Sequence, residues 1–275
     1  MGENSPPLGL WIDDAPTTVL GPGYLDELKA LGIKTAAIMC SAPGSGWRPT
    51  WTADQIARVC GALIARDIEV VLTTWPSPRR AVIDECCGWL EAVVPWGAAA
   101  LEVDLEGQWK PVEMRGFDGL TEAAAYLVAR LRAITSGRDV RLELTTHPWH
   151  TESSPRALVA PHVDRILEQA YSIHRRPGGQ VVEWDDKRLG PGAHQRFALD
   201  DALGVPGVAN GRPRLAAGLA AWSQVWPGHE PAEAMDTALG AALDYELAEV
   251  RLWSSKWVLG AQSNGYSAAW LRSLQ

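Results

Sequence analysis

The stretch Leu101-Glu-Val-Asp-Leu-Glu106 alternates apolar and acidic residues without interruption. Successive side chains of a β-strand point to opposite faces, so the apolar residues share one face and the three acids share the other. In a closed barrel the outer face of a strand packs against helices, which requires the apolar set to point outward and the acids to point inward. The stretch therefore predicts a barrel strand with an acidic inner face.

Seven further runs are typical of strands, and helical patterns separate most of them, as in parallel βα units. The predicted strands are Leu8–Asp13, Ile33–Cys40, Ile68–Thr74, Ala98–Leu105, Val140–Thr146, Arg165–Tyr171, Leu215–Trp222 and Glu249–Ser254. The predicted helices are Tyr24–Leu31, Thr52–Arg66, Arg79–Val93, Thr121–Thr135, Pro231–Leu247 and a weaker Ser154–Ala160.

A (β/α)₈ barrel needs about 250 residues, and the chain has 275. We therefore predict one TIM-like barrel domain over residues 1–275. The connection Ser172–Arg214 after the sixth strand is rich in Gly and Pro, so we expect it to be irregular, with a brief helical run near Gln195–Leu203.

Charged residues of both signs fall on the predicted inner faces of other strands. An unpaired charge inside a barrel is prohibitively costly, so these residues must pair with one another. We expect Arg141, Arg251 or both to form ion pairs with Glu102, Glu143 or Glu249.

The composition limits the function. The formal charge of −8 argues against a nucleic-acid partner, and no apolar run reaches the roughly 18 residues of a membrane span. No secretory signal is legible at the start, which predicts cytoplasmic accumulation with release by another route, or association with a phage or virion. The four cysteines lack metal-ligand spacing and are expected to be reduced thiols. No cofactor is predicted.

Acids end two of the predicted strands, at the barrel end where such folds place their chemistry. Asp104 and Glu106 lie two residues apart, about 6.5–7 Å between Cα atoms, and Asp13 ends the first strand. Like charges this close raise one pKa, so one carboxyl stays protonated near neutrality, as cleavage of a glycosidic bond requires. We predict Glu106 as the general acid, with Asp104 and Asp13 as supporting carboxylates.

The chain holds 14 Trp against 2 Phe and 5 Tyr, and this excess suggests flat platforms for sugar rings. His147 and His150 could bind substrate or a metal, or be loop histidines satisfied by a neighbour; no metal site is predicted. The predicted substrate-binding residues are Trp75, Trp109, His147, Tyr171, Trp222, Gln224 and Trp253.

These strand ends resemble the family-25 glycoside hydrolases, barrel muramidases that cut peptidoglycan. The resemblance rests on Trp11-Ile-Asp-Asp-Ala-Pro16, Leu101-Glu-Val-Asp-Leu-Glu106, Gln169-Ala-Tyr171 and Trp222-Ser-Gln224. The run Glu102-Val-Asp-Leu-Glu106 also resembles the D-x-D-x-E of the family-18 chitinases, with Glu102 in place of the first Asp, and Trp253 is similar to their strand-eight tryptophan. Both families act on N-acetylated sugars, and the chitinases use the acetamido group of the substrate as nucleophile.

The resemblance implies a glycosidase acting on peptidoglycan or another N-acetylhexosamine polymer. Two alternatives stay open. The same acids could bind Mg²⁺ or Ca²⁺ in a phosphodiesterase or lyase, which chelation would reveal. A barrel that binds carbohydrate without cleaving it would show binding and no turnover.

Overall fold

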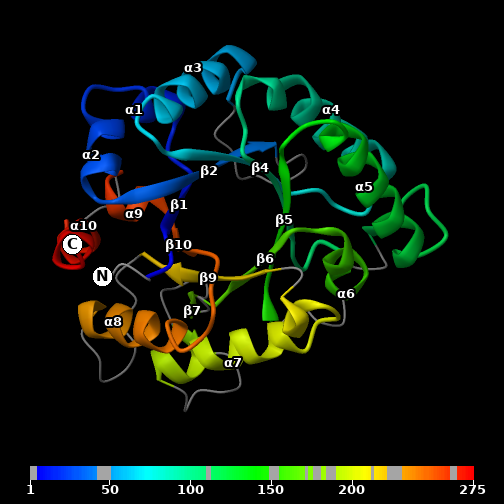
Figure 1. Cartoon of the computed structure of the whole chain (residues 1–275). Helices are drawn as coiled ribbons and strands as arrows, with labels where there is room; N and C mark the ends of the chain where they lie inside the picture. Colours follow the sequence, from blue (N-terminus) through cyan, green and yellow to red (C-terminus); the bar gives the residue numbers. More distant parts are fainter. Residues whose placement is uncertain are drawn as a thin grey trace.

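A computed structural model describes residues 5–41, 51–109, 113–148, 155–170, 173–175, 181–183, 190–211, 214–221, 231–260 and 265–275. Eight parallel strands close into a barrel in the order β1-β10-β9-β6-β5-β4-β3-β2, with helices around the outside (Figure 1). The prediction of a (β/α)₈ barrel is confirmed. The barrel strands are β1 (Leu8–Ile12), β2 (Ile33–Ser41), β3 (Glu69–Thr74), β4 (Ala100–Leu105), β5 (Arg141–Thr146), β6 (Arg165–Gln169), β9 (Arg214–Ala220) and β10 (Val250–Trp253).

The helices are α1 (Pro16–Val19), α2 (Tyr24–Ala30), α3 (Ala53–Ile64), α4 (Arg80–Val93), α5 (Leu120–Thr135), α6 (Arg156–Val159), α7 (Pro191–Leu203), α8 (Pro231–Ala242), α9 (Ser255–Val258) and α10 (Tyr266–Ser273), with 3-10 turns η1 (Val94–Trp96), η4 (Ala160–His162) and η5 (Val208–Asn210). The predicted helices are present with changed boundaries, among which α8 ends at Ala242 rather than Leu247, and the structure adds α1, α9 and α10, which were not predicted. Helix α3 begins at a capping box, in which Thr52 and Gln55 each accept from the other's backbone N–H. Within the described ranges, no helix is both long and apolar enough to span a bilayer.

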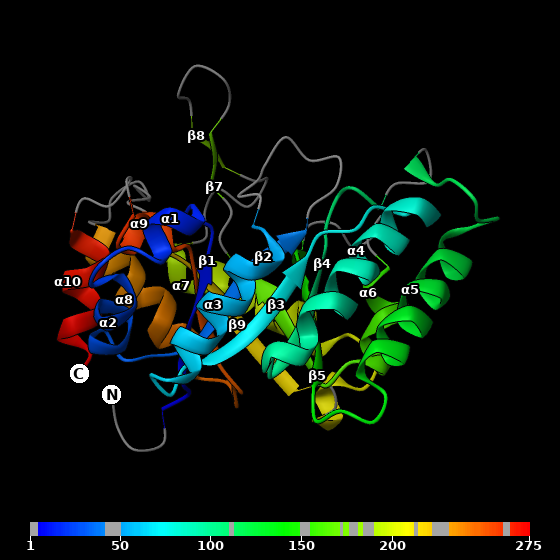
Figure 2. The ribbon, with the colours of Figure 1, turned by 90° about the horizontal axis from the view of Figure 1, so that it is seen from above.

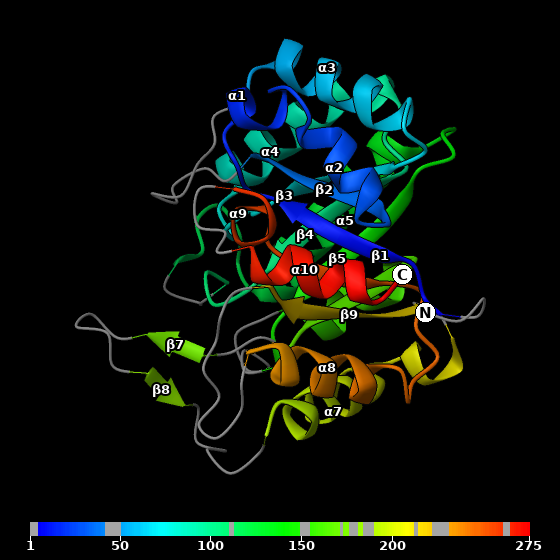
Figure 3. The same cartoon turned by 90° about the vertical axis from the view of Figure 1, so that its left-hand side faces the viewer.

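The connection after β6 is more regular than the sequence predicted. It contains the hairpin of β7 (Ile173–Arg175) and β8 (Val181–Glu183), and α7 extends over 13 residues. The pair Pro191-Gly192 looks like a helix breaker, yet proline suits the first turn of a helix. A Cβ on Gly192 would come 3.0 Å from Thr237 of α8, so the glycine lets the two helices approach closely. The hairpin projects beyond one end of the barrel (Figures 2 and 3).

The strands separate two sets of apolar residues, as the alternation in β4 predicted. The outward residues, such as Leu101 and Val103, join the large core beneath the helices. Inside the barrel the apolar cluster is small and consists of Trp11, Ala37, Val71, Ala100, Leu167 and Ala216. Much of the interior is therefore left to polar and charged side chains.

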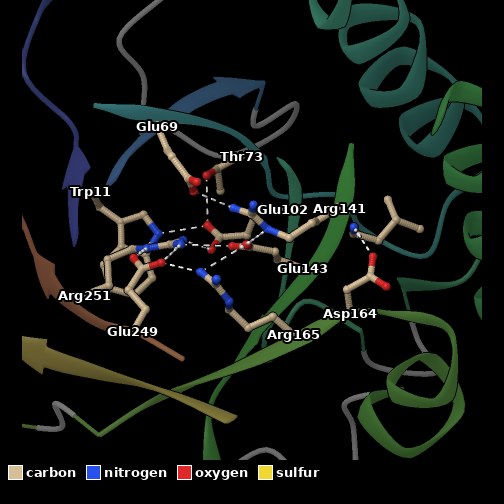
Figure 4. Close-up of polar contacts among 11 residues, drawn as sticks. Trp11, Glu69, Thr73, Glu102, Arg141, Glu143, Asp164, Arg165, Glu249 and Arg251 are labelled. Atoms are coloured by element: carbon tan, nitrogen blue, oxygen red, sulfur yellow. Dashed lines mark hydrogen bonds and ion pairs between the residues drawn. The ribbon is translucent and has the colours of Figure 1, made fainter. Parts of the chain in front are cut away.

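An ionic network centred on Arg251 occupies this interior (Figure 4). The fully buried guanidinium of Arg251 pairs with Glu102, with Glu143 at 2.9 Å and with Glu249 at 2.6 Å. Arg165 joins by pairing with Glu249 and, at 3.2 Å, with Glu143. The predicted interior pairing is confirmed.

Two further contacts complete the network. Arg141 pairs with Glu143 at 3.4 Å and with Glu69 at 2.7 Å. A Cβ on Gly9 would clash with the carboxylate of Glu249, so β1 needs a glycine where it passes this charge. The ion pairs of the network thus join residues of β3, β4, β5, β6 and β10, together with Glu249 directly before β10.

Candidate active site

Asp104 and Glu106 lie where β4 ends, at the carboxyl end of the barrel, as predicted. The Asp104 side chain is only 5% exposed, whereas Glu106 is partly exposed. Gln169, the last residue of β6, donates from Nε2 to Oδ1 of Asp104 at 3.1 Å and also hydrogen-bonds the carboxyl of Glu106. One amide therefore links the two acids across the barrel interior.

The segment after β4 fixes the backbone of the acid pair. Oε1 of Gln108 accepts from the backbone N–H of Glu106 at 2.9 Å. Nε2 of the same Gln108 donates to the carbonyl oxygens of Asp104 and Pro76, at 3.0 and 3.2 Å. Because Pro76 follows β3, this one side chain ties the ends of β3 and β4 together. The indole N–H of Trp75 adds a hydrogen bond to the Glu106 carboxyl.

The surroundings of the pair favour bound protons. Burial raises the pKa of Asp104 well above its usual range, and the charges of Glu106 and Glu102 raise it further. Burial also raises the pKa of Glu106, against the opposing hydrogen bonds from Gln169 and Trp75. In the described part of the chain neither carboxyl has a cationic partner. The sequence-based prediction placed the proton on Glu106 alone, whereas burial favours a bound proton on Asp104 as well.

Asp13 lies at the same end of the barrel but is held by other partners. Its Oδ1 accepts from the hydroxyls of Ser254 and Ser255 at 2.6 and 3.3 Å and from the backbone N–H of Lys256 at 3.3 Å. Its Oδ2 pairs with the Lys256 ammonium at 3.2 Å. These contacts fasten β1 to the start of α9. Asp13 therefore anchors these two segments, and among the described residues no hydrogen bond or ion pair joins it to the acid pair.

The neighbouring Asp14 is buried as well. Its Oδ2 accepts from the hydroxyls of Tyr24 and Ser255, both at 2.7 Å. A Cβ on Gly260 would clash with this carboxylate, so the chain after α9 passes directly over it. Asp14 therefore belongs to the same anchor as Asp13.

The aromatic candidates have different surroundings. Trp109 is 0% exposed and donates its indole N–H to the Pro76 carbonyl at 2.8 Å, so its predicted role as a sugar platform is wrong: it packs in the core. Trp75 and Trp253 are partly exposed, and Trp253 meets Trp11 edge to face with centroids 5.6 Å apart. His147 is buried after β5. The candidates Tyr171, Trp222 and Gln224, and also His150, lie outside the described residues.

Gln169, like Gln108, contacts the acid pair and was not among the predicted site residues. Its place on the inner face at the end of β6 was legible, but an amide carries no charge to single it out. The three-acid metal site is not formed, since the described residues contain no group of three or more His, Cys, Asp or Glu that could hold an ion.

Several solved structures share the fold of this chain. The xylanase and α-amylase inhibitor protein XAIP-II from Scadoxus multiflorus matches with a TM-score of 0.61 and 12% identity, over 98% of both chains. A chitinase from Rhizomucor miehei matches with a TM-score of 0.61 and 14% identity, over 98% of this chain and 100% of that one. A chitinase from Bacteroides thetaiotaomicron gives a TM-score of 0.51 and 9% identity, over 90% and 88% of the two chains.

At these identities the similarity establishes the fold alone. No protein-family model matches the sequence, and no curated protein matches it.

Proposed function

We propose that this chain is a glycoside hydrolase that cleaves an N-acetylhexosamine polymer, with Glu106 as the general acid. The observation that carries the proposal is the Asp104–Glu106 pair, in which Asp104 is buried, Gln169 bridges the two carboxyls, and neither has a cationic partner among the described residues. Burial raises the pKa of both carboxyls and so favours a bound proton, which a general acid needs.

The difference in exposure between Glu106 and Asp104 is the basis for assigning their roles. Glu106 is the more exposed carboxyl and lies further toward the open end, so it can reach a glycosidic oxygen. It donates a proton to that oxygen as the bond to the sugar breaks, and a water molecule completes the hydrolysis and returns a proton to the pair. Asp104, buried beneath it, holds the second carboxyl that orients the reacting sugar.

The substrate class rests on resemblance and on fold. The run Glu102-Val-Asp-Leu-Glu106 resembles the acidic motif of family-18 chitinases, and two of the solved structures with this fold are chitinases. Partly exposed Trp253 above Trp11 offers an apolar face of the kind that stacks on pyranose rings. We therefore propose oligomers of N-acetylglucosamine as one substrate and peptidoglycan, which contains the same sugar, as the other.

The test is digestion of N-acetylglucosamine oligomers and of purified cell-wall sacculi, followed by mass analysis of the products. We expect fragments with new reducing ends from at least one substrate, and unchanged yields after chelation. If chelator abolishes turnover and Mg²⁺ restores it, a metal-dependent phosphodiesterase or lyase replaces the glycoside hydrolase as the proposed function.

A non-catalytic barrel is the second candidate, because a solved structure with this fold is an inhibitor protein. Calorimetric binding of the same oligomers without any cleavage would establish it. The buried acid pair would then have no catalytic task, and Glu106→Gln would leave binding unaltered.

A further inference from the structure

We infer that Gln169 is a positioning residue that holds Asp104 and Glu106 as one unit and keeps the proton of Glu106 exchangeable. The inference rests on the proposed function, because it assigns Gln169 a part in that reaction. It predicts a change in pH dependence, which a merely structural residue would not cause.

The place of Gln169 is fixed by its backbone. It is the last residue of β6, is 2% exposed and lies in register with Gly218 of β9. A Cβ on Gly218 would come within 3.2 Å of the Gln169 Cα, so the glycine permits this close approach. The next residue, Ala170, donates its N–H to the Gly218 carbonyl at 3.2 Å. The amide is therefore presented from a rigid strand end.

The amide group suits two carboxyls at once. Its nitrogen carries two N–H donors and no acceptor, so it can donate to Asp104 and to Glu106 together. Each donated bond favours the ionised carboxylate, in opposition to burial and to the mutual repulsion of the acids. Without this amide both carboxyls would hold protons more tightly.

The proposed reaction requires this balance between burial, which raises the pKa of Glu106, and the donated hydrogen bonds, which lower it. Glu106 must release its proton to the glycosidic oxygen and recover one in the next turnover, so its pKa has to stay near the working pH. Burial raises that pKa, and the hydrogen bonds from Gln169 and Trp75 limit the rise. The two donors come from β6 and β3, on opposite sides of the strand that carries the acids.

The experiment compares Gln169→Met with the wild type in two readouts. Methionine keeps the side-chain length and removes both donors. The alkaline limb of the kcat/KM profile, where Glu106 loses its proton, should move upward by about one pH unit or more, because one charge-assisted hydrogen bond is lost. Carbon-13 NMR titration of labelled carboxyls should show the same upward shift of the Glu106 pKa without any substrate.

A matched control is Gln195→Met, which removes an equally buried amide from α7. We expect it to leave the pH profile unchanged. If Gln169→Met does not fold, Gln169→Glu preserves the shape and replaces the donors by a third carboxyl, so the shift should be in the same direction and larger.

The outcomes separate this inference from the proposed function. A wild type that cleaves no glycan would overturn the function, while the NMR titration would still test Gln169. Activity that depends on Glu106, combined with an unshifted titration in both Gln169 variants, would overturn the inference and leave the function standing.

Discussion

Arg251→Met tests the ionic interior of the barrel. Methionine keeps most of the apolar stem of arginine, so the substitution removes the charge and its hydrogen bonds with little change of volume. It leaves the carboxylates of Glu102, Glu143 and Glu249 buried without the guanidinium they share. We expect a folded but strongly destabilised barrel.

The three carboxylates are affected unequally. Glu143 keeps ion pairs with Arg165 and Arg141, and Glu249 keeps one with Arg165. Glu102 loses its only cationic partner among the described residues and keeps the indole N–H of Trp11 and the hydroxyl of Thr73, both at 2.8 Å. Breaking a buried pair costs about 3–5 kcal/mol, with Glu102 carrying the largest share. At about 2 °C per kcal/mol in a chain of this size, Tm falls by about 6–10 °C.

The destabilisation caused by Arg251→Met should depend on pH. Burial acts to raise the pKa of Glu143, but Arg251 and Arg165 outweigh it and hold that pKa below its usual value. A lowered pKa stabilises the fold above the unfolded value of about 4.3, and this stability is lost as the pH falls through the folded value. The difference in Tm between wild type and Arg251→Met should therefore be largest near pH 7 and narrow below about pH 4.

Calorimetry of both proteins from about pH 3 to about pH 8 measures this difference in Tm. The control is Arg196→Met, which breaks an exposed pair with Asp244 worth at most about 1 kcal/mol. An Arg251→Met protein that melts within about 2 °C of the wild type at pH 7 would refute the reasoning.

Two further predictions concern other buried carboxyls. Burial outweighs the attraction of Arg156 and raises the pKa of Glu168 to about 8, so the stability it contributes is lost as the pH rises from about 4.3 through 8. The Tm of Glu168→Gln should fall less than that of the wild type between pH 5 and 8, and an equally steep fall would contradict this. Asp13→Asn should lose about 1–3 kcal/mol of stability through its contacts with Ser254 and Lys256, with kcat reduced less than tenfold. A hundredfold loss of kcat at unchanged Tm would contradict this and would show that Asp13 takes part in catalysis.

The fold was predictable because one signal repeats along the chain. Alternation in β4 and charges on β5 and β10 indicated both the barrel and its ionic interior, since buried charges must pair. The length of α7 was underestimated because its first residues, Pro191-Gly192, are typical of a helix break. Only the close packing against α8 explains why a glycine stands there within a helix. Tertiary contact decided that element.

The sequence predicted the position of the three acids at one end of the barrel, whereas their contacts were harder to predict. The partners of Asp13 come from residues some 240 positions away, which no local pattern reveals. Trp109 shows the same limit, because its burial depends on packing in the apolar core and on the position of the Pro76 carbonyl, neither of which the sequence reveals. The contact of Gln169 with the acids could not be predicted, because it depends on the relative placement of β6 and β4 in the barrel.

The most direct test of the proposed hydrolase is the rate of reducing-end release by wild type and Glu106→Gln, measured side by side on N-acetylglucosamine oligomers and on sacculi. An amide has the shape of the acid but no proton to give. We predict that Glu106→Gln melts at the wild-type temperature and loses at least about 10²-fold in rate on every glycan that the wild type cleaves. Full activity of Glu106→Gln on those glycans would contradict the assignment of Glu106 as the general acid.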